Sequence, residues 1–129
     1  TGMPFEIRWF NDDMACLSSA LTEIDASEER FAQCFADPDI AVSYLCRGGT
    51  YLVISADVAR SQQKYGNRSL HYALIECGAV MQNVGVAAAE MGLVSRPIGG
   101  FFPSNLATVI GVDELLPLLT MMISPATGD

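Results

Sequence analysis

The longest stretch with one consistent pattern is NRSLHYALIECGAVMQNVGVAAAEMG, residues 67–92, and we expect it to form a single helix. Its apolar residues recur at alternating spacings of four and three, which places them on one side of an α-helix. They are Leu70, Leu74, Cys77, Met81, Val84, Ala88 and Met91. Asn67 is the expected N-cap and Gly92 the residue that ends the helix. The opposite side is small rather than polar, so we expect an enclosed helix, at the centre of a domain or on a dimer axis.

The composition is that of one folded domain, with 129 residues of which 50% are hydrophobic and 17% charged. The formal net charge of −8 disfavours nucleic acid and anionic membranes as partners, because both are negatively charged. The most apolar run, about 70–94, contains Glu76, Gln82, Asn83 and Glu90. Such groups are costly inside a bilayer, so we predict no membrane span.

Cysteine usage indicates a reducing compartment. The chain contains Cys16, Cys34, Cys46 and Cys77, without a Cys-x-x-Cys pair, and a single histidine. A zinc site and a dense disulfide framework are therefore both disfavoured. With no signal-peptide pattern, we expect reduced thiols in a cytoplasmic protein.

The segments around the helix alternate between strand-like and helix-like patterns. We expect strands over 4–10, 14–21, 48–58 and 115–123, and helices over 27–35, 39–46 and 104–111. Pro97, Gly99 and Gly100 are expected to keep 93–105 irregular, and Pro117 to break the last strand. The prediction is one α+β domain over 1–129, with an antiparallel or mixed sheet packed on the long central helix.

The pair Lys64-Tyr65 stands just before the central helix. A lysine near the positive end of a helix dipole has its ammonium form disfavoured, and burial acts in the same direction. Such a lysine can act as a base near neutral pH. The alternative is a solvated Lys64 with Tyr65 packed over the helix start, and spacing alone favours this alternative, because short motifs are weak signals.

The segment PIGGF, residues 97–101, follows the helix. Consecutive glycines allow a backbone to approach a flat ligand, and their N–H groups can donate to its heteroatoms. The alternative is a sharp turn, which is the more frequent role of a lone Gly-Gly pair. The segment matches neither the dinucleotide-binding fingerprint nor a Walker-type phosphate loop.

Taken together, residues 64–101 resemble the C-terminal half of flavin-dependent oxidoreductases of the nitroreductase superfamily. They are most similar to the branch of azoline dehydrogenases, which act on peptides that contain thiazolines or oxazolines. The positions that carry the resemblance are Lys64, Tyr65, Arg68, Tyr72, Ala73, Leu74, Glu76, Gly78, Gln82, Asn83, Ala88, Gly92, Leu93, Gly99, Gly100 and Phe101. Upstream, EIRWFNDD (6–13) and YLVISAD (51–57) stand where that family has two sheet strands.

The resemblance implies a nitroreductase-like α+β fold, a dimer, and FMN bound across the interface near the long helix. It places cofactor-binding residues at Pro97, Ile98, Gly99, Gly100 and Arg68. The two glycines would donate backbone N–H groups near N5 and O4 of the isoalloxazine ring.

The resemblance also implies the chemistry. Lys64 and Tyr65 would be the catalytic acid/base pair, with Lys64 taking a proton from the substrate while N5 accepts a hydride. The substrate would be an azoline in a modified peptide or a small molecule, oxidised by two electrons to an azole.

One motif of that family has no counterpart here, an N-terminal Arg-Arg-Ser-x-Arg type segment that holds the FMN phosphate. We therefore expect a fragment, a reduced half, or a subunit completed by another chain, and we expect this chain alone to hold FMN poorly. A homodimer or a hetero-oligomer with a completing chain would supply the missing part. The rival interpretation is a non-catalytic, flavin-free subunit of the same fold, serving dimerisation or substrate presentation.

Overall fold

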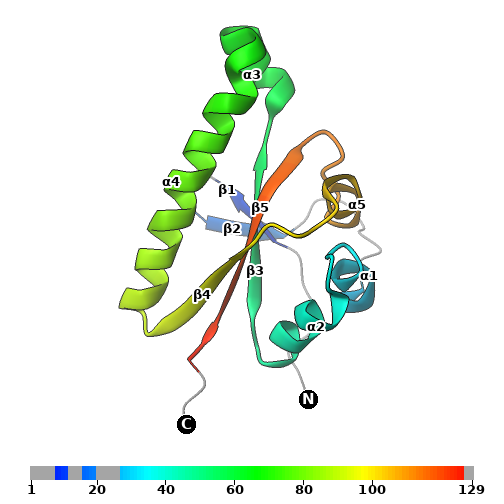
Figure 1. Ribbon diagram of the computed structural model, residues 1–129, viewed down its shortest axis with the longest axis vertical. Coiled ribbons are helices and arrows are strands. Elements are labelled where there is room, and N and C mark those ends of the chain that lie inside the picture. The colour runs from blue at the N-terminus through cyan, green and yellow to red at the C-terminus, as the bar shows by residue number, and fades with distance from the viewer. Residues whose placement is uncertain (1–7, 12–15, 20–26, 127–129) are drawn as a thin grey trace.

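Three antiparallel strands form the main sheet of the computed structural model, which describes residues 8–11, 16–19 and 27–126 (Figure 1). Their spatial order is β3 (Thr50–Ala56), β5 (Leu116–Pro125) and β4 (Leu93–Ile98). The last strand of the chain is thus the central one, and both of its neighbours run antiparallel to it. The predicted α+β class with an antiparallel sheet is confirmed.

A separate antiparallel pair is formed by β1 (Arg8–Asn11) and β2 (Cys16–Ser19). Trp9 stands opposite Ser18 in this pair. Strands were expected over 4–10 and 14–21, and both are confirmed in these shorter ranges. The other residues of those two segments lie outside the described part of the chain.

The long helix is α4 (Ser69–Glu90), and it follows α3 (Val58–Tyr65) and the short 3-10 helix η1 (Gly66–Arg68). The predicted N-cap at Asn67 is therefore wrong. Gly66 has a φ of +55°, a conformation that glycine adopts readily, and the chain changes direction there before α4 begins. At the other end the prediction is confirmed, since Gly92 has a φ of +70° directly after the helix.

The prediction of a helix enclosed within its own domain is wrong for this chain. Figure 1 shows α4 lying along β4 at one side of the molecule, with no other described helix or strand on its outer side. Cys77 and Ala88 are buried, but Leu74 is 53% and Met91 73% exposed, and Glu76 is exposed as well. The sheet covers one side of α4 only, so the dimer-axis alternative remains.

By length and composition alone, the helical run Val58–Glu90 could cross a membrane. This is weak evidence, because the core helix of a soluble protein passes the same test. Such a core helix is mostly buried, whereas only 11% of the most apolar stretch of this run is buried. Much of the apolar surface of α4 therefore lacks a cover within the described residues.

The hydrophobic core lies on the other side of the molecule, under three short helices (Figure 1). These are α1 (Glu28–Ala32), α2 (Pro38–Cys46) and α5 (Pro103–Val109). Phe31 and Tyr51 pack edge to face, with ring centroids 5.2 Å apart, and Leu106 is fully buried. Ser27 caps the first helix, since its Oγ accepts a hydrogen bond from the Arg30 N–H at 3.2 Å.

Two predictions about prolines are wrong, and the strand order explains both. Residues 93–98 were expected to be irregular, but Pro97 lies in β4 opposite Met121. β4 is an edge strand, where a residue without an N–H is tolerated. Pro117 does not break β5, because the pairing of β5 with β4 starts only at Thr120. On the other side Pro117 pairs with Ser55, next to a shift in the register between β3 and β5.

Candidate functional site

Lys64 and Tyr65 are the last two residues of α3, the helix that leads into the long helix α4. Asp57 begins α3 by accepting the Arg60 N–H on its Oδ1 at 3.0 Å. Lys64 was expected at the positive end of a helix dipole and in a buried setting. Instead it lies in the last turn of α3, where the dipole is negative, and its side chain is exposed. This chain alone therefore meets neither of the two conditions, a positive helix end and burial, under which a lysine can act as a base near neutral pH.

Aromatic contacts tie the pair to the start of α4. The Lys64 Nζ lies 5.1 Å from the centroid of the Tyr65 ring, within the range of a cation–π contact. The Tyr65 ring packs edge to face on Tyr72 of α4, with centroids 5.1 Å apart. Tyr65 thus packs over the helix start, as the structural alternative predicted, and it also fixes where the lysine amine stands.

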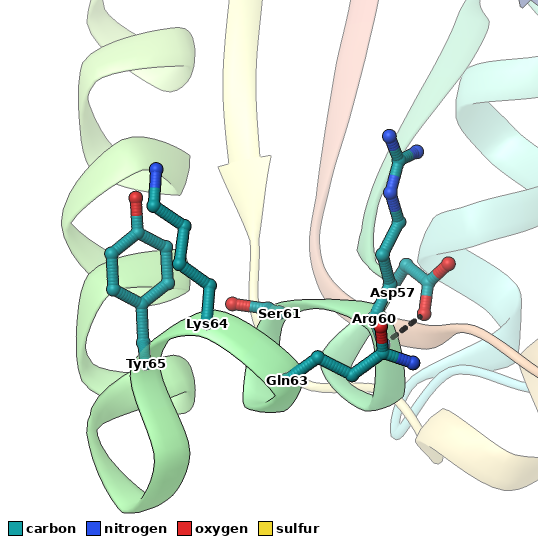
Figure 2. A pocket seen from close by; sticks show the side chains of 6 residues that line it. All are labelled: Asp57, Arg60, Ser61, Gln63, Lys64 and Tyr65. Atoms are coloured by element: carbon teal, nitrogen blue, oxygen red, sulfur yellow. Dashed lines mark hydrogen bonds between the residues drawn. The ribbon is translucent and has the colours of Figure 1, made fainter.

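Lys64 and Tyr65 line an open pocket of about 580 Å³ at this end of the molecule (Figure 2). The other residues that line it are Asp57, Arg60, Ser61 and Gln63. Its volume is that of a small-molecule site, but its lining is polar and it is wide open to solvent. In one chain, the pocket contains the predicted acid/base pair without a cover that would exclude water.

The glycine loop lies directly after β4. The Gly100 carbonyl accepts the Ala36 N–H at 2.8 Å, and the Gly99 carbonyl accepts the Phe101 N–H at 3.0 Å. Neither glycine N–H donates a hydrogen bond within the described part of the chain. A Cβ at Gly99 would meet no atom within 4 Å, so the backbone there is open to approach. The two N–H groups are available as donors to a ligand.

The structure places the predicted site residues in two separate groups. Lys64, Tyr65 and Arg68 stand at the start of α4, whereas Pro97, Ile98 and the glycines stand at the far end of β4. Strand β4 runs back along α4, but six residues of strand span about 20 Å and the helix about 33 Å. Strand β4 therefore ends about 13 Å short of the helix start along this direction. The pocket that contains Lys64 has no residue of the glycine loop in its lining.

Sequence reasoning found Lys64 and Tyr65 but missed Arg60, Ser61 and Gln63, the other residues of α3 that line the pocket. A signal for them was present in the charges. Arg60, Lys64 and Arg68 are spaced by four, and residues 58–75 contain no Asp or Glu although the chain carries 15 acidic residues. Positive charge is thus concentrated at this end of an acidic protein.

A second, smaller pocket of about 270 Å³ lies under α1 and α5 and includes Cys34. Burial raises the pKa of the Cys34 thiol, and the Arg30 charge opposes this only in part. A raised pKa keeps the sulfur protonated and unreactive near neutral pH. Cys34 is therefore a packing residue, and this pocket does not compete with the one on α3.

Comparisons with known proteins agree with one another. The profile described as "Nitroreductase family" matches residues 14–124. A protein of Methanocaldococcus jannaschii named "Putative nitroreductase MJ1384" is 33% identical over 72 residues, which are 56% of this chain and 36% of the relative. A chain in the structure titled "E. coli Microcin synthetase McbBCD complex with truncated pro-MccB17 bound" has the same fold, with a TM-score of 0.74 and 18% identity. That match covers 94% of this chain but 44% of the other. The chain thus spans less than half the length of either protein.

Proposed function

The chain belongs to the nitroreductase family, and from this premise we propose that it is part of an FMN-dependent oxidoreductase that oxidises an azoline in a peptide or small molecule. The observation that carries the proposal is the position of Lys64. Its amine is held by the Tyr65 ring at the mouth of an open pocket, beside the start of the family's long helix.

Oxidation of an azoline to an azole removes one proton and one hydride from neighbouring ring atoms. Bound FMN would supply the hydride acceptor. Lys64, as the neutral amine, would take the proton, and the Tyr65 ring beside it would favour the ammonium that results. The open side of the pocket would admit the heterocycle.

The residues present fit a flavin in part. The unpaired N–H groups of Gly99 and Gly100 suit the acceptor atoms at the edge of the ring, with Pro97 and Ile98 beside them. Arg68 is an exposed cation at the start of α4, where it could meet a phosphate. These groups are too far apart in one chain to form one site, so we propose that a second chain completes it.

The exposed part of α4 is the surface on which a second chain would sit. The exposed apolar residues of this helix and its C-cap are Leu70, Leu74, Ile75, Val80, Val86 and Met91. Gln82 and Asn83 are exposed on the same helix, and these groups disfavour a bilayer as the cover. We propose a homodimer or a hetero-oligomer through α4. The free thiols of Cys34, Cys46 and Cys77 suit the reducing cytoplasm.

The rival proposal is a flavin-free subunit that serves dimerisation or substrate presentation. The separation of Lys64 from the glycine loop favours it, since the pocket that contains Lys64 has no residue of the glycine loop in its lining. Adding FMN to the purified full-length protein, with absorbance and flavin fluorescence as readouts, separates the two proposals. Bound flavin that is bleached without oxygen by a synthetic thiazoline peptide supports the enzyme. A protein that takes up no FMN, alone or with its partner chain, would leave only the rival.

A further inference from the structure

We propose that the pocket on α3 binds a carboxylate of the substrate, with Arg60 as the residue that recognises it and Lys64 beside it. This inference rests on the proposed function for the identity of the substrate, a peptide. It adds a substrate class, namely azoline peptides with a carboxylate near the heterocycle, either an acidic side chain or the C-terminus.

The first support is the arrangement of charge. Arg60 is one turn of helix before Lys64, so the two cations project from the same side of α3. Figure 2 shows both side chains extending the same way, with the Ser61 hydroxyl between their bases. No acidic residue occurs from 58 to 75, in a chain with a net charge of −8. An anion entering the pocket thus meets the Arg60 guanidinium and a hydroxyl donor, and a second cation when Lys64 is protonated.

The second support is that this arrangement is unfavourable for the helix itself. Like charges four residues apart repel one another, and Arg60 lies in the first turn, where a cation opposes the helix dipole. The first turn itself contains no acidic residue, and the one carboxylate beside it is that of the N-cap Asp57. α3 buries none of its residues, so packing does not explain the choice of arginine either. A ligand that uses the charge does explain it.

The pocket suits a single negative charge better than a phosphate dianion. Asp57 also lines it, and its carboxylate is engaged in capping α3 beside Arg60. Once Lys64 has taken the substrate proton, which is the state that the oxidised thiazole meets, the lining carries two positive charges and one negative charge. A carboxylate, which arginine binds through two parallel hydrogen bonds, matches that balance.

The test uses two synthetic thiazole peptides, identical except that one ends in a carboxylate and the other in a carboxamide. Thiazoles are the oxidised form, so their binding to the full-length protein can be measured by calorimetry without turnover. We expect the carboxylate peptide to bind about tenfold more tightly at low salt. The preference should shrink at high salt, because the pocket is open and its charges are screened. A matched pair with an internal Glu or Gln separates a side-chain carboxylate from the C-terminal one.

The variants are Arg60→Gln, Arg60→Lys and, as a control, Arg47→Gln. Arg47 is exposed at the end of α2, so its loss changes the net charge equally without touching the pocket. Arg60→Gln should abolish the preference, Arg60→Lys should restore part of it, and Arg47→Gln should leave it intact. Equal binding of acid and amide in both peptide pairs, no binding of either, or an equal effect of Arg47→Gln would overturn the inference. Turnover of a thiazoline peptide without any such preference would overturn it while leaving the proposed function standing. A preference for the carboxylate peptide without turnover of any thiazoline peptide would support the carboxylate site and overturn the proposed enzyme activity.

Discussion

Truncating Leu74, an exposed residue of α4, tests whether the exposed surface of this helix is an interface between two copies of the chain. Leu74 is 53% exposed, so a partner could bury about half of the side chain. Full burial of a leucine contributes about 1.5–3 kcal/mol, so that half contributes about 0.8–1.6 kcal/mol. Alanine keeps one of the four side-chain carbons, which leaves a loss of about 0.6–1.2 kcal/mol per copy. A two-fold interface contains the residue twice, for a total of about 1.2–2.4 kcal/mol.

Such a loss raises the dissociation constant of the dimer about 7- to 50-fold. Sedimentation equilibrium of the full-length protein over a range of concentrations measures this constant. Ile40→Ala is the matched control, because Ile40 is 43% exposed on α2, on the other side of the molecule. The dimer of the Ile40→Ala variant should have the same dissociation constant as that of the unchanged protein. A dimer whose affinity is unaffected by Leu74→Ala, or weakened equally by Ile40→Ala, would refute the assignment of this face, and a strictly monomeric protein would refute the homodimer.

Three further predictions concern single side chains. Lys64→Ala should lower turnover of a thiazoline peptide by about 10²–10⁴ while the melting temperature stays close to that of Gln62→Ala, a neighbouring exposed position; a fall in stability alone would favour the structural role. Burial, with a smaller contribution from Tyr44, raises the pKa of Tyr51 from 10.0 to about 12, so folding favours the neutral phenol. The free energy of unfolding should hold below pH 10 and fall as the pH rises toward 12, and urea titrations of Tyr51→Phe should show a smaller fall. The exposed Cys46 should react with iodoacetamide at pH 8 well before Cys34, whose pKa is raised by burial, and mass spectrometry that finds equal labelling would contradict this.

Local chemistry predicted the ends of several elements, because the relevant interactions lie within a few residues. Ser27 and Asp37 each cap a helix, because the side chain accepts a hydrogen bond from the backbone N–H three residues later. This spacing can be read in the sequence. Gly92 ends α4 because its positive φ suits glycine. Where the local signal was ambiguous, the prediction failed. Asn67 has the chemistry of a cap, but Gly66 turns the chain first and Asn67 becomes part of η1.

Features that depend on distant parts of the chain were not predictable in this way. Whether Pro97 interrupts a strand depends on whether that strand is at the edge of the sheet, and strand order is set by the whole fold. The apolar pattern of α4 indicated that its sides would be covered, but it carried no information on whether the cover is the same chain or another. In the site, the motif located Lys64 and Tyr65, whereas Arg60 belongs to no motif and was visible only as part of a charge pattern.

The exposure of α4 and the incompleteness of the site have one common explanation. A second chain packed on α4 would remove water from the helix start, where Lys64 and Tyr65 stand, and would bring its own groups toward them. Loss of water disfavours the ammonium form of a lysine, which is the condition that the single chain does not meet. The same contact could place a glycine loop of the second chain, with its two free N–H groups, opposite the pocket. If so, variants that weaken the α4 interface should lower turnover in proportion to the loss of dimer, even when Lys64 and the glycines are unchanged.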